Sequence, residues 1–323
     1  MKKLKKLTAI ILLGLLIFSS IDVKGQDPSF SQPMNNPLLL NPSLMGMDNS
    51  MRAILNYRNQ WNGLDKGFNT ASFSFIMPIF LNDGEWLQGN GRKRLDVGVN
   101  TTADIAGAFT RLNASASIGY GLFVSEKSFL HASLNIGYLQ NSLDASGLIF
   151  DDQYQWGAYD ASSTTGESFA NTSVNAIDVG FGFLWRYMNE DSNLNAFAGL
   201  SAYHLNQPDI SFHSEKEALP SRFSLQAGLT IKGEDDLNFH PTAIYTSQGS
   251  YDLFMTGLLA DYKNIMLGCW YKSGESIVLQ TGYDHESFLF SYSYDFGNSV
   301  VSRNIHGIMT HEISLAYKFK AKY

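Results

Sequence analysis

The sequence predicts an all-β protein: an outer-membrane, antiparallel, up-and-down β-barrel of about 14 strands, with a docked irregular N-terminal segment. Three observations carry the prediction: an export signal, alternating apolar and polar residues along most of the chain, and an even number of alternating segments. The alternation is clear in the last segment, 311–323. There Ile313 and Leu315 share one parity, while Glu312 and Ser314 share the other. Because side chains alternate faces in a strand, one face is apolar and the other polar.

Residues 1–25 are expected to be a secretory signal peptide. Four lysines precede an apolar core at 7–21, and Gly25 provides a small residue for cleavage before Gln26. The alternative is a membrane anchor, but the apolar run is shorter than the ~20 residues that span a bilayer. No cysteine follows Gly25 directly, which disfavours a lipoprotein.

The composition excludes several classes of protein. Without the signal, the chain has 18 basic and 29 acidic residues, a net charge of −11, which argues against binding nucleic acid. Its single cysteine, Cys269, forms no internal disulfide and shares parity with Leu267, so we expect it on an apolar face. Mean hydropathy is only −0.12 despite 22 Phe and 16 Tyr, as expected where every second residue meets lipid.

Residues 26–50 are expected to form a separate docking segment before a barrel at 51–323. Closely spaced prolines and two Asn-Pro steps oppose a regular helix or a central strand. Apolar residues at 38–40 are unusual for a free linker, so the segment is expected to dock in the bore or at the periplasmic rim. An exposed leader is the alternative. The expected docking residues are Leu38, Leu39, Leu40, Asn41 and Pro42.

Fourteen strands are expected in the barrel. In the clearest, Leu225 and Leu229 should face lipid, and Ser224 and Gln226 the lumen. Leu225→Arg should therefore be costly and Gln226→Arg mild. The expected strands are 51–60, 69–80, 95–104, 110–124, 129–143, 175–187, 194–205, 222–232, 238–247, 251–260, 265–272, 276–283, 288–296 and 311–323.

The connections indicate the orientation of the barrel. Long connections at 144–174, 206–220 and 298–309 fall at one end, as external loops do, whereas the other end has tight turns apart from 81–94. Aromatic residues mixed with acids make the first long loop a candidate binding surface. The alternative is that these aromatics plug the mouth or pack on other loops. The expected partner-binding residues are Tyr154, Trp156, Tyr159, Gln207 and Pro208.

No motif indicates an enzyme, a cofactor or a metal site. The sequence lacks a Gly-x-Ser-x-Gly elbow, a Walker loop and a dinucleotide fingerprint. The seven histidines form no metal-binding cluster, and the acids at 234–236 are expected to be a solvated turn. His204, His306 and His311 are expected to be isolated histidines in loops or at the membrane interface.

Several short motifs follow one another along the chain: 26–32 (Gln-Asp-Pro-Ser-Phe-Ser-Gln), the Asn-Pro steps at 36–37 and 41–42 with Gly46, 57–61 (Tyr-Arg-Asn-Gln-Trp), 199–208, 220–222, 267–272, 292–295 and 311–315. In this order they resemble the PorP/SprF family of outer-membrane barrels associated with the type IX secretion system and gliding motility. The resemblance covers essentially the whole mature chain. It assigns structural roles to the motif residues Arg58, Trp61, Arg222 and Asp295.

The resemblance implies a non-enzymatic barrel of the cell outer membrane. Its expected partners are a secreted surface protein (an adhesin), engaged through its C-terminal domain for export or surface anchoring, and other type IX secretion components. Membrane lipid surrounds it, and nucleic acid is not a partner. A channel or transporter for hydrophobic or small solutes is the alternative, which the polar residues expected on the inward face disfavour. A general porin is a third possibility.

Overall fold

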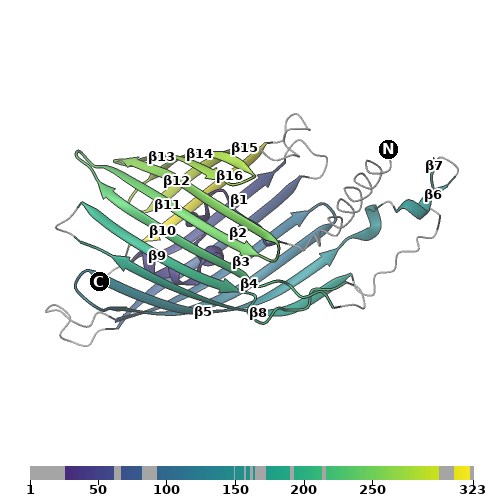
Figure 1. The fold of residues 1–323 in the computed structure, drawn as a ribbon, viewed down its shortest axis with the longest axis horizontal. Helices are drawn as coiled ribbons and strands as arrows, with labels where there is room; N and C mark the ends of the chain where they lie inside the picture. The colour runs from purple at the N-terminus through teal and green to yellow at the C-terminus, as the bar shows by residue number, and fades with distance from the viewer. Residues whose placement is uncertain are drawn as a thin grey trace, which may run out of the picture.

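The computed structural model describes residues 26–61, 67–81, 93–148, 150–155, 158–160, 163, 172–189, 193–212, 216–297 and 309–320. The expected signal peptide lies outside them. Fourteen antiparallel strands close into one barrel, in which β1 pairs with both β2 and β16 (Figure 1). The predicted fold class is confirmed. No helix in the described ranges has the length and apolar character needed to cross a membrane.

Each wall strand pairs with its neighbours along the chain, and β5 pairs with β8 because β6 and β7 form a separate small hairpin. The strands of the barrel are β1 (Met51–Gln60), β2 (Phe68–Leu81), β3 (Lys93–Ala106), β4 (Phe109–Phe123), β5 (Ser128–Leu143), β8 (Ser173–Tyr187), β9 (Leu194–Tyr203), β10 (Arg222–Lys232), β11 (Leu237–Gln248), β12 (Tyr251–Tyr262), β13 (Ile265–Lys272), β14 (Ser276–Asp284), β15 (Phe288–Gly297) and β16 (Thr310–Phe319). The hairpin strands are β6 (Tyr154–Gln155) and β7 (Ala158–Tyr159), after the 3-10 turns η3 (Ala145–Gly147) and η4 (Asp151–Gln153).

Side chains face inward and outward as the alternation predicts. Leu225 is 57% exposed on the outer wall, whereas Ser224 and Gln226 are each 2% exposed. Gln226 nevertheless does not face open space, because its Oε1 accepts a hydrogen bond from Asn41 Nδ2 at 2.9 Å. We therefore no longer expect Gln226→Arg to be mild, because a longer cationic side chain there should displace Asn41 and the N-terminal segment.

Residues 26–50 run through the barrel as a plug, visible in purple inside the wall in Figure 1. One end of the plug lies beside the start of β4 and the end of β11. There Asp27 contacts Arg111 of β4 and Gln248 of β11. The other end lies beside Arg94 of β3. The plug contains η1 (Pro33–Asn35), the single turn α2 (Pro37–Leu40) and η2 (Pro42–Met47).

The loops fix which end of the barrel is external. The long connections after β5, β9 and β15 all leave the end that holds Asp27, which we call the external mouth. Outer-membrane barrels carry their longer loops outside. The opposite end, where Met51 pairs with Phe319, is the periplasmic rim. The plug therefore runs from the external mouth at Asp27 to the periplasmic rim, where β1 begins.

The inward wall is less polar than the sequence indicated. Four inward side chains form an apolar cluster, against which Leu40 and Met34 of the plug pack. Leu38, only 1% exposed, packs with Met45 of the plug and Ile76 of β2. Inward positions that face the plug can be apolar because the plug keeps them out of water. The wall cluster is Ile244, Met255, Trp270 and Val278.

Candidate functional site: the external vestibule and the plug anchor

A cavity of about 630 Å³, here called the vestibule, opens at the external mouth. Residues 26–29 of the plug border it, together with the external ends of wall strands and part of the β9–β10 loop. Cavities that bind small ligands usually measure about 300–1,000 Å³. The vestibule thus has the size of a binding site and takes one of its surfaces from the plug.

Aromatic side chains form part of the vestibule lining. Trp61 and Phe68 lie with ring centroids 4.9 Å apart, and Phe109 meets Phe212 edge-on at 6.0 Å. Trp61 also has a φ of 60°, a left-handed conformation that is uncommon for a bulky residue. Such strain persists where surrounding structure enforces it, and it is frequent at binding sites.

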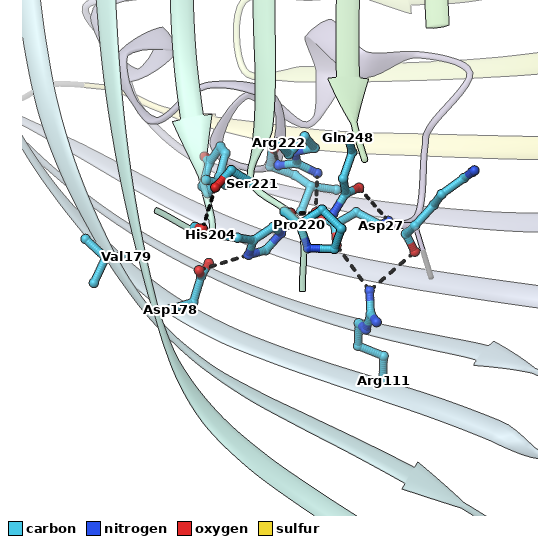
Figure 2. A network of polar contacts seen from close by, with 12 residues as sticks. Asp27, Arg111, Asp178, Val179, His204, Pro220, Ser221, Arg222 and Gln248 are labelled. Atoms are coloured by element: carbon cyan, nitrogen blue, oxygen red, sulfur yellow. Dashed lines mark hydrogen bonds and ion pairs between the residues drawn. The ribbon is translucent and has the colours of Figure 1, made fainter. Parts of the chain in front are cut away.

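Asp27 anchors the plug below the vestibule, and Figure 2 shows its carboxylate between three cationic groups. Its oxygens lie 2.7 Å from His204 Nε2, 2.8 Å from Arg222 Nη1 and 3.1 Å from Arg111 Nη1. His204 Nδ1 contacts Asp178 at 2.9 Å on its other side. Residues from β4, β10 and the β9–β10 loop thus converge on one residue of the plug, and Asp178 of β8 supports His204 from behind.

Electrostatics hold this anchor in its charged form. Burial alone would lower the pKa of His204, but the carboxylates of Asp27 and Asp178 outweigh burial and raise that pKa from 6.5 to about 9. Burial alone would raise the pKa of Asp27, but His204, Arg222 and Arg111 outweigh it and hold the pKa well below its usual range. At neutral pH, His204 is therefore cationic and Asp27 anionic.

Alkaline pH should weaken the anchor. A pKa raised from 6.5 to about 9 contributes stability that is complete below pH 6.5 and disappears as pH rises through 9. The difference in melting temperature between wild type and His204→Gln should therefore shrink between pH 6.5 and 10, as followed by heat-modifiable migration. A difference that stays constant over this range would contradict a charged His204.

A second pair of carboxylates holds the next turn of the plug. Glu312 accepts hydrogen bonds from the backbone N–H groups of Ser31 at 2.5 Å and Gln32 at 2.9 Å. Asp295 accepts the Ser31 hydroxyl at 2.7 Å and lies 3.6 Å from Arg58 Nη2. These contacts fix the plug against β15 and β16.

Arginines hold the lower plug by its backbone carbonyls. Arg222 Nη2 donates to Leu39 O at 2.6 Å, and Arg186 Nη1 donates to Gly46 O at 2.6 Å. Arg94 Nη2 donates to Met45 O at 2.9 Å and to Asp48 O at 2.8 Å. The plug is thus attached to the wall along its whole length, and not at one point only.

The expected docking residues lie inside the lumen. Asn41 Nδ2 reaches Phe183 O, Leu200 O and Gln226 Oε1 at 2.9–3.2 Å. Of the remaining docking residues, Leu38 and Pro42 are buried, and Leu39 and Leu40 are partly buried.

The four motif residues lie at or near the vestibule. Arg58, Trp61 and Asp295 line it, and Arg222 contacts Asp27 at its floor.

The expected partner-binding residues are spread over two loops. Tyr154 and Tyr159 pair in the β6–β7 hairpin and are 62% and 43% exposed. Trp156 lies outside the described residues. In the β9–β10 loop, Gln207 is exposed with a φ of 43°, while Pro208 is buried.

The sequence interpretation missed the Asp27 anchor. His204 was expected to be isolated, and this is wrong, because it lies between two carboxylates and is 2% exposed. Its φ of 54° also ends β9 at Tyr203, two residues before the expected end. Two features of the sequence could have indicated the anchor. Arg111 has the parity of inward-facing residues, and Asp27 is an acid directly before Pro28.

The other two histidines that were expected to be isolated are His311 and His306. His311 is partly buried and contacts the Tyr292 hydroxyl at 2.7 Å, and His306 lies outside the described residues. Within the described part of the chain, no group of three or more His, Cys, Asp and Glu side chains could hold a metal ion.

The sequence model of the type IX secretion system membrane protein PorP/SprF matches residues 22–317. The chain belongs to the PorP/SprF family. Together with the closed barrel and its apolar outer wall, this membership makes it a multi-pass β-barrel of the cell outer membrane. No curated protein matches the sequence significantly.

Solved structures with similar folds include a hydrocarbon channel, a toluene transporter and a FadL homologue. The CymD monoaromatic hydrocarbon channel has a TM-score of 0.52 at 14% identity, covering 91% of this chain and 94% of its own. The Pseudomonas putida toluene transporter TodX has a TM-score of 0.52 at 12% identity, with coverages of 91% and 95%. A Pseudomonas aeruginosa FadL homologue has a TM-score of 0.50 at 12% identity, with coverages of 86% and 92%. At these identities the PorP/SprF chain shares a fold with them.

Proposed function

We propose that this PorP/SprF protein is a non-enzymatic outer-membrane component that partners a secreted surface protein, an adhesin, for export or surface anchoring. The observation that carries the proposal is the plug, which occupies the lumen from the external mouth to the periplasmic rim. A barrel occupied in this way offers its two ends to other molecules.

The attachment of the plug supports a binding role over free passage of solutes. Carboxylates hold it near the mouth, Asn41 holds it in the middle, and Arg94 holds it near the rim. Opening a wide path would break several buried, charge-assisted hydrogen bonds together, at a cost of about 1.5–3 kcal/mol each. A role based on contacts at the two ends requires no such change.

The external end is the proposed contact for the secreted partner, through that protein's C-terminal domain. Specific binding by a membrane barrel must use its loops, since its walls face lipid. Tyr154 and Tyr159 in the first long loop, and Gln207 in the next, are exposed. The periplasmic rim is the proposed contact for other components of type IX secretion or gliding machinery.

Co-purification from native outer membranes tests the proposal. The tagged wild-type chain should recover a secreted surface protein, and Trp156→Ala should weaken its binding by about 2 kcal/mol or more, roughly 30-fold, if Trp156 is a hot spot. Tyr262→Ala is the matched control, since Tyr262 is an exposed aromatic at the periplasmic end of β12. Wild-type protein that recovers no secreted protein would contradict the proposed function.

A transporter of hydrophobic or small solutes is the second candidate. It is supported by the fold shared with TodX and CymD and by the apolar cluster around Trp270 inside the barrel. Against it, Leu40 and Met34 of the plug pack on this cluster. Faster uptake of toluene by intact cells that produce the barrel than by cells that lack it would support this candidate and contradict a plug that stays closed.

A further inference from the structure

The charges accessible in the vestibule are predominantly acidic. Glu217 is exposed, Asp104 is partly buried, and the Glu275 side chain is 32% exposed. The lining arginines, Arg58 and Arg111, have side chains only 4% and 6% exposed. A molecule that enters from outside therefore meets carboxylates before it meets guanidinium groups.

The arginines are also turned toward acceptors of the protein itself. Arg111 donates to Asn141 Oδ1, Gln26 O and Asp27 Oδ1 at 3.0–3.3 Å. Arg58 Nη2 lies 3.6 Å from Asp295. Glu275 is likewise paired, with Lys272 Nζ at 2.7 Å, so Asp104 and Glu217 remain as the carboxylates that can attract a ligand by charge.

A buried acceptor on the lining provides an independent indication. Asp295 is 5% exposed, and its Oδ1 has no hydrogen-bond partner among the described residues. Buried polar atoms are nearly always paired, so an unpaired carboxylate oxygen indicates a missing donor. Arg58 beside it also has unpaired Nε and Nη1 atoms.

The aromatic lining suits the same type of ligand. The faces of Trp and Phe rings attract cations within about 6 Å, most strongly for Trp. Lys and Arg side chains also have long apolar stems that pack on aromatic surfaces while their charged heads reach polar groups. Trp61 can receive the stem, since the Phe109 ring already has the Arg111 guanidinium over it at 5.8 Å, and Asp104 and Glu217 can receive the charged head.

We propose that the vestibule binds a lysine or arginine side chain from an extended segment of the secreted partner. This inference rests on the proposed function and adds the chemistry of the contact. The basic head lies near Asp104 and Glu217, and the neighbouring peptide lies over residues 26–29 of the plug. Charge complementarity with the net-acidic lining then selects the basic segment.

Calorimetry with the full-length barrel in lipid nanodiscs tests the contact. The probe is a capped Gly-Arg-Phe-Gly peptide, and capped Gly-Glu-Phe-Gly is the charge-reversed control. The arginine peptide should bind at least tenfold more tightly, and 0.5 M salt should reduce its affinity. Equal affinities of the two peptides, or no binding at 1 mM, would overturn the proposal.

Variants locate the contact. Asp104→Asn with Glu217→Gln should weaken binding of the arginine peptide at least tenfold. The control pair, Glu234→Gln with Asp235→Asn, removes two exposed acids from the β10–β11 turn at the periplasmic end and should change nothing. Unchanged binding by the first pair, with heat-modifiable migration intact, would place the contact outside the vestibule.

Two further measurements separate this proposal from others. Spermidine or Mg²⁺ that displaces the arginine peptide at micromolar concentration would overturn a peptide contact in favour of a free cation. Co-purification separates the two proposals: recovery of the same secreted protein with wild type and with the Asp104/Glu217 pair refutes only the vestibule contact. Failure of wild type to recover any partner refutes the proposed function.

Discussion

Replacement of Leu225 by arginine should prevent assembly of the barrel or cost about 2–4 kcal/mol. Leu225 lies near the middle of β10, is 57% exposed on the outer wall, and pairs with Leu200 and Tyr245 on the neighbouring strands. An arginine there would hold its charge in hydrocarbon, with neither water nor an anionic partner. Urea titration of the barrel in liposomes, with folding followed by gel migration, measures the loss.

Leu225→Met is the matched control, because it keeps an apolar side chain of similar volume and should cost less than about 1.5 kcal/mol. Thr230→Arg is a second control. It adds the same charge to β10 at a partly exposed position of the opposite parity, which does not face lipid. If Leu225→Arg folds with the stability of Leu225→Met, then Leu225 does not face lipid, and the inward and outward assignments of β10 are reversed.

Replacement of Asp27 by alanine should release the outer end of the plug while the wall stays closed. Asp27 is the carboxylate that Arg111, Arg222 and His204 share. Removing one partner from a buried ion pair costs about 3–5 kcal/mol, because the remaining charges stay buried without compensation. The barrel strands keep their backbone pairing, so heat-modifiable migration should persist with a lowered transition temperature.

A single cysteine at position 29 reports the release, in a background with Cys269→Ser. A membrane-impermeant maleimide added to intact cells should label Ser29→Cys faster in Asp27→Ala than in its parent. Asp209→Ala is the control, since Asp209 is an exposed acid in the β9–β10 loop. Equal labelling rates in all three proteins would show that Asp27 does not anchor the plug.

The alternation of residues by itself determined the wall of this protein. Period-2 patterns such as Ile313 and Leu315 against Glu312 and Ser314 indicated which side chains face out, and the structure agrees. The prediction succeeds because the pattern is local to each strand: one face meets hydrocarbon and the other does not. The same reasoning gave the strand count, since each segment is counted from its own residues.

The tertiary structure decided what lies inside the wall. Asp27, Arg111 and His204 are far apart in the sequence, and no period relates them, so only closure of the barrel around the plug brings them together. The path of the plug also depends on closure, because its irregular backbone has no residue periodicity from which a path could be predicted. For the same reason Trp270 and Gln226 could be placed on the inward face by parity, but not against the plug.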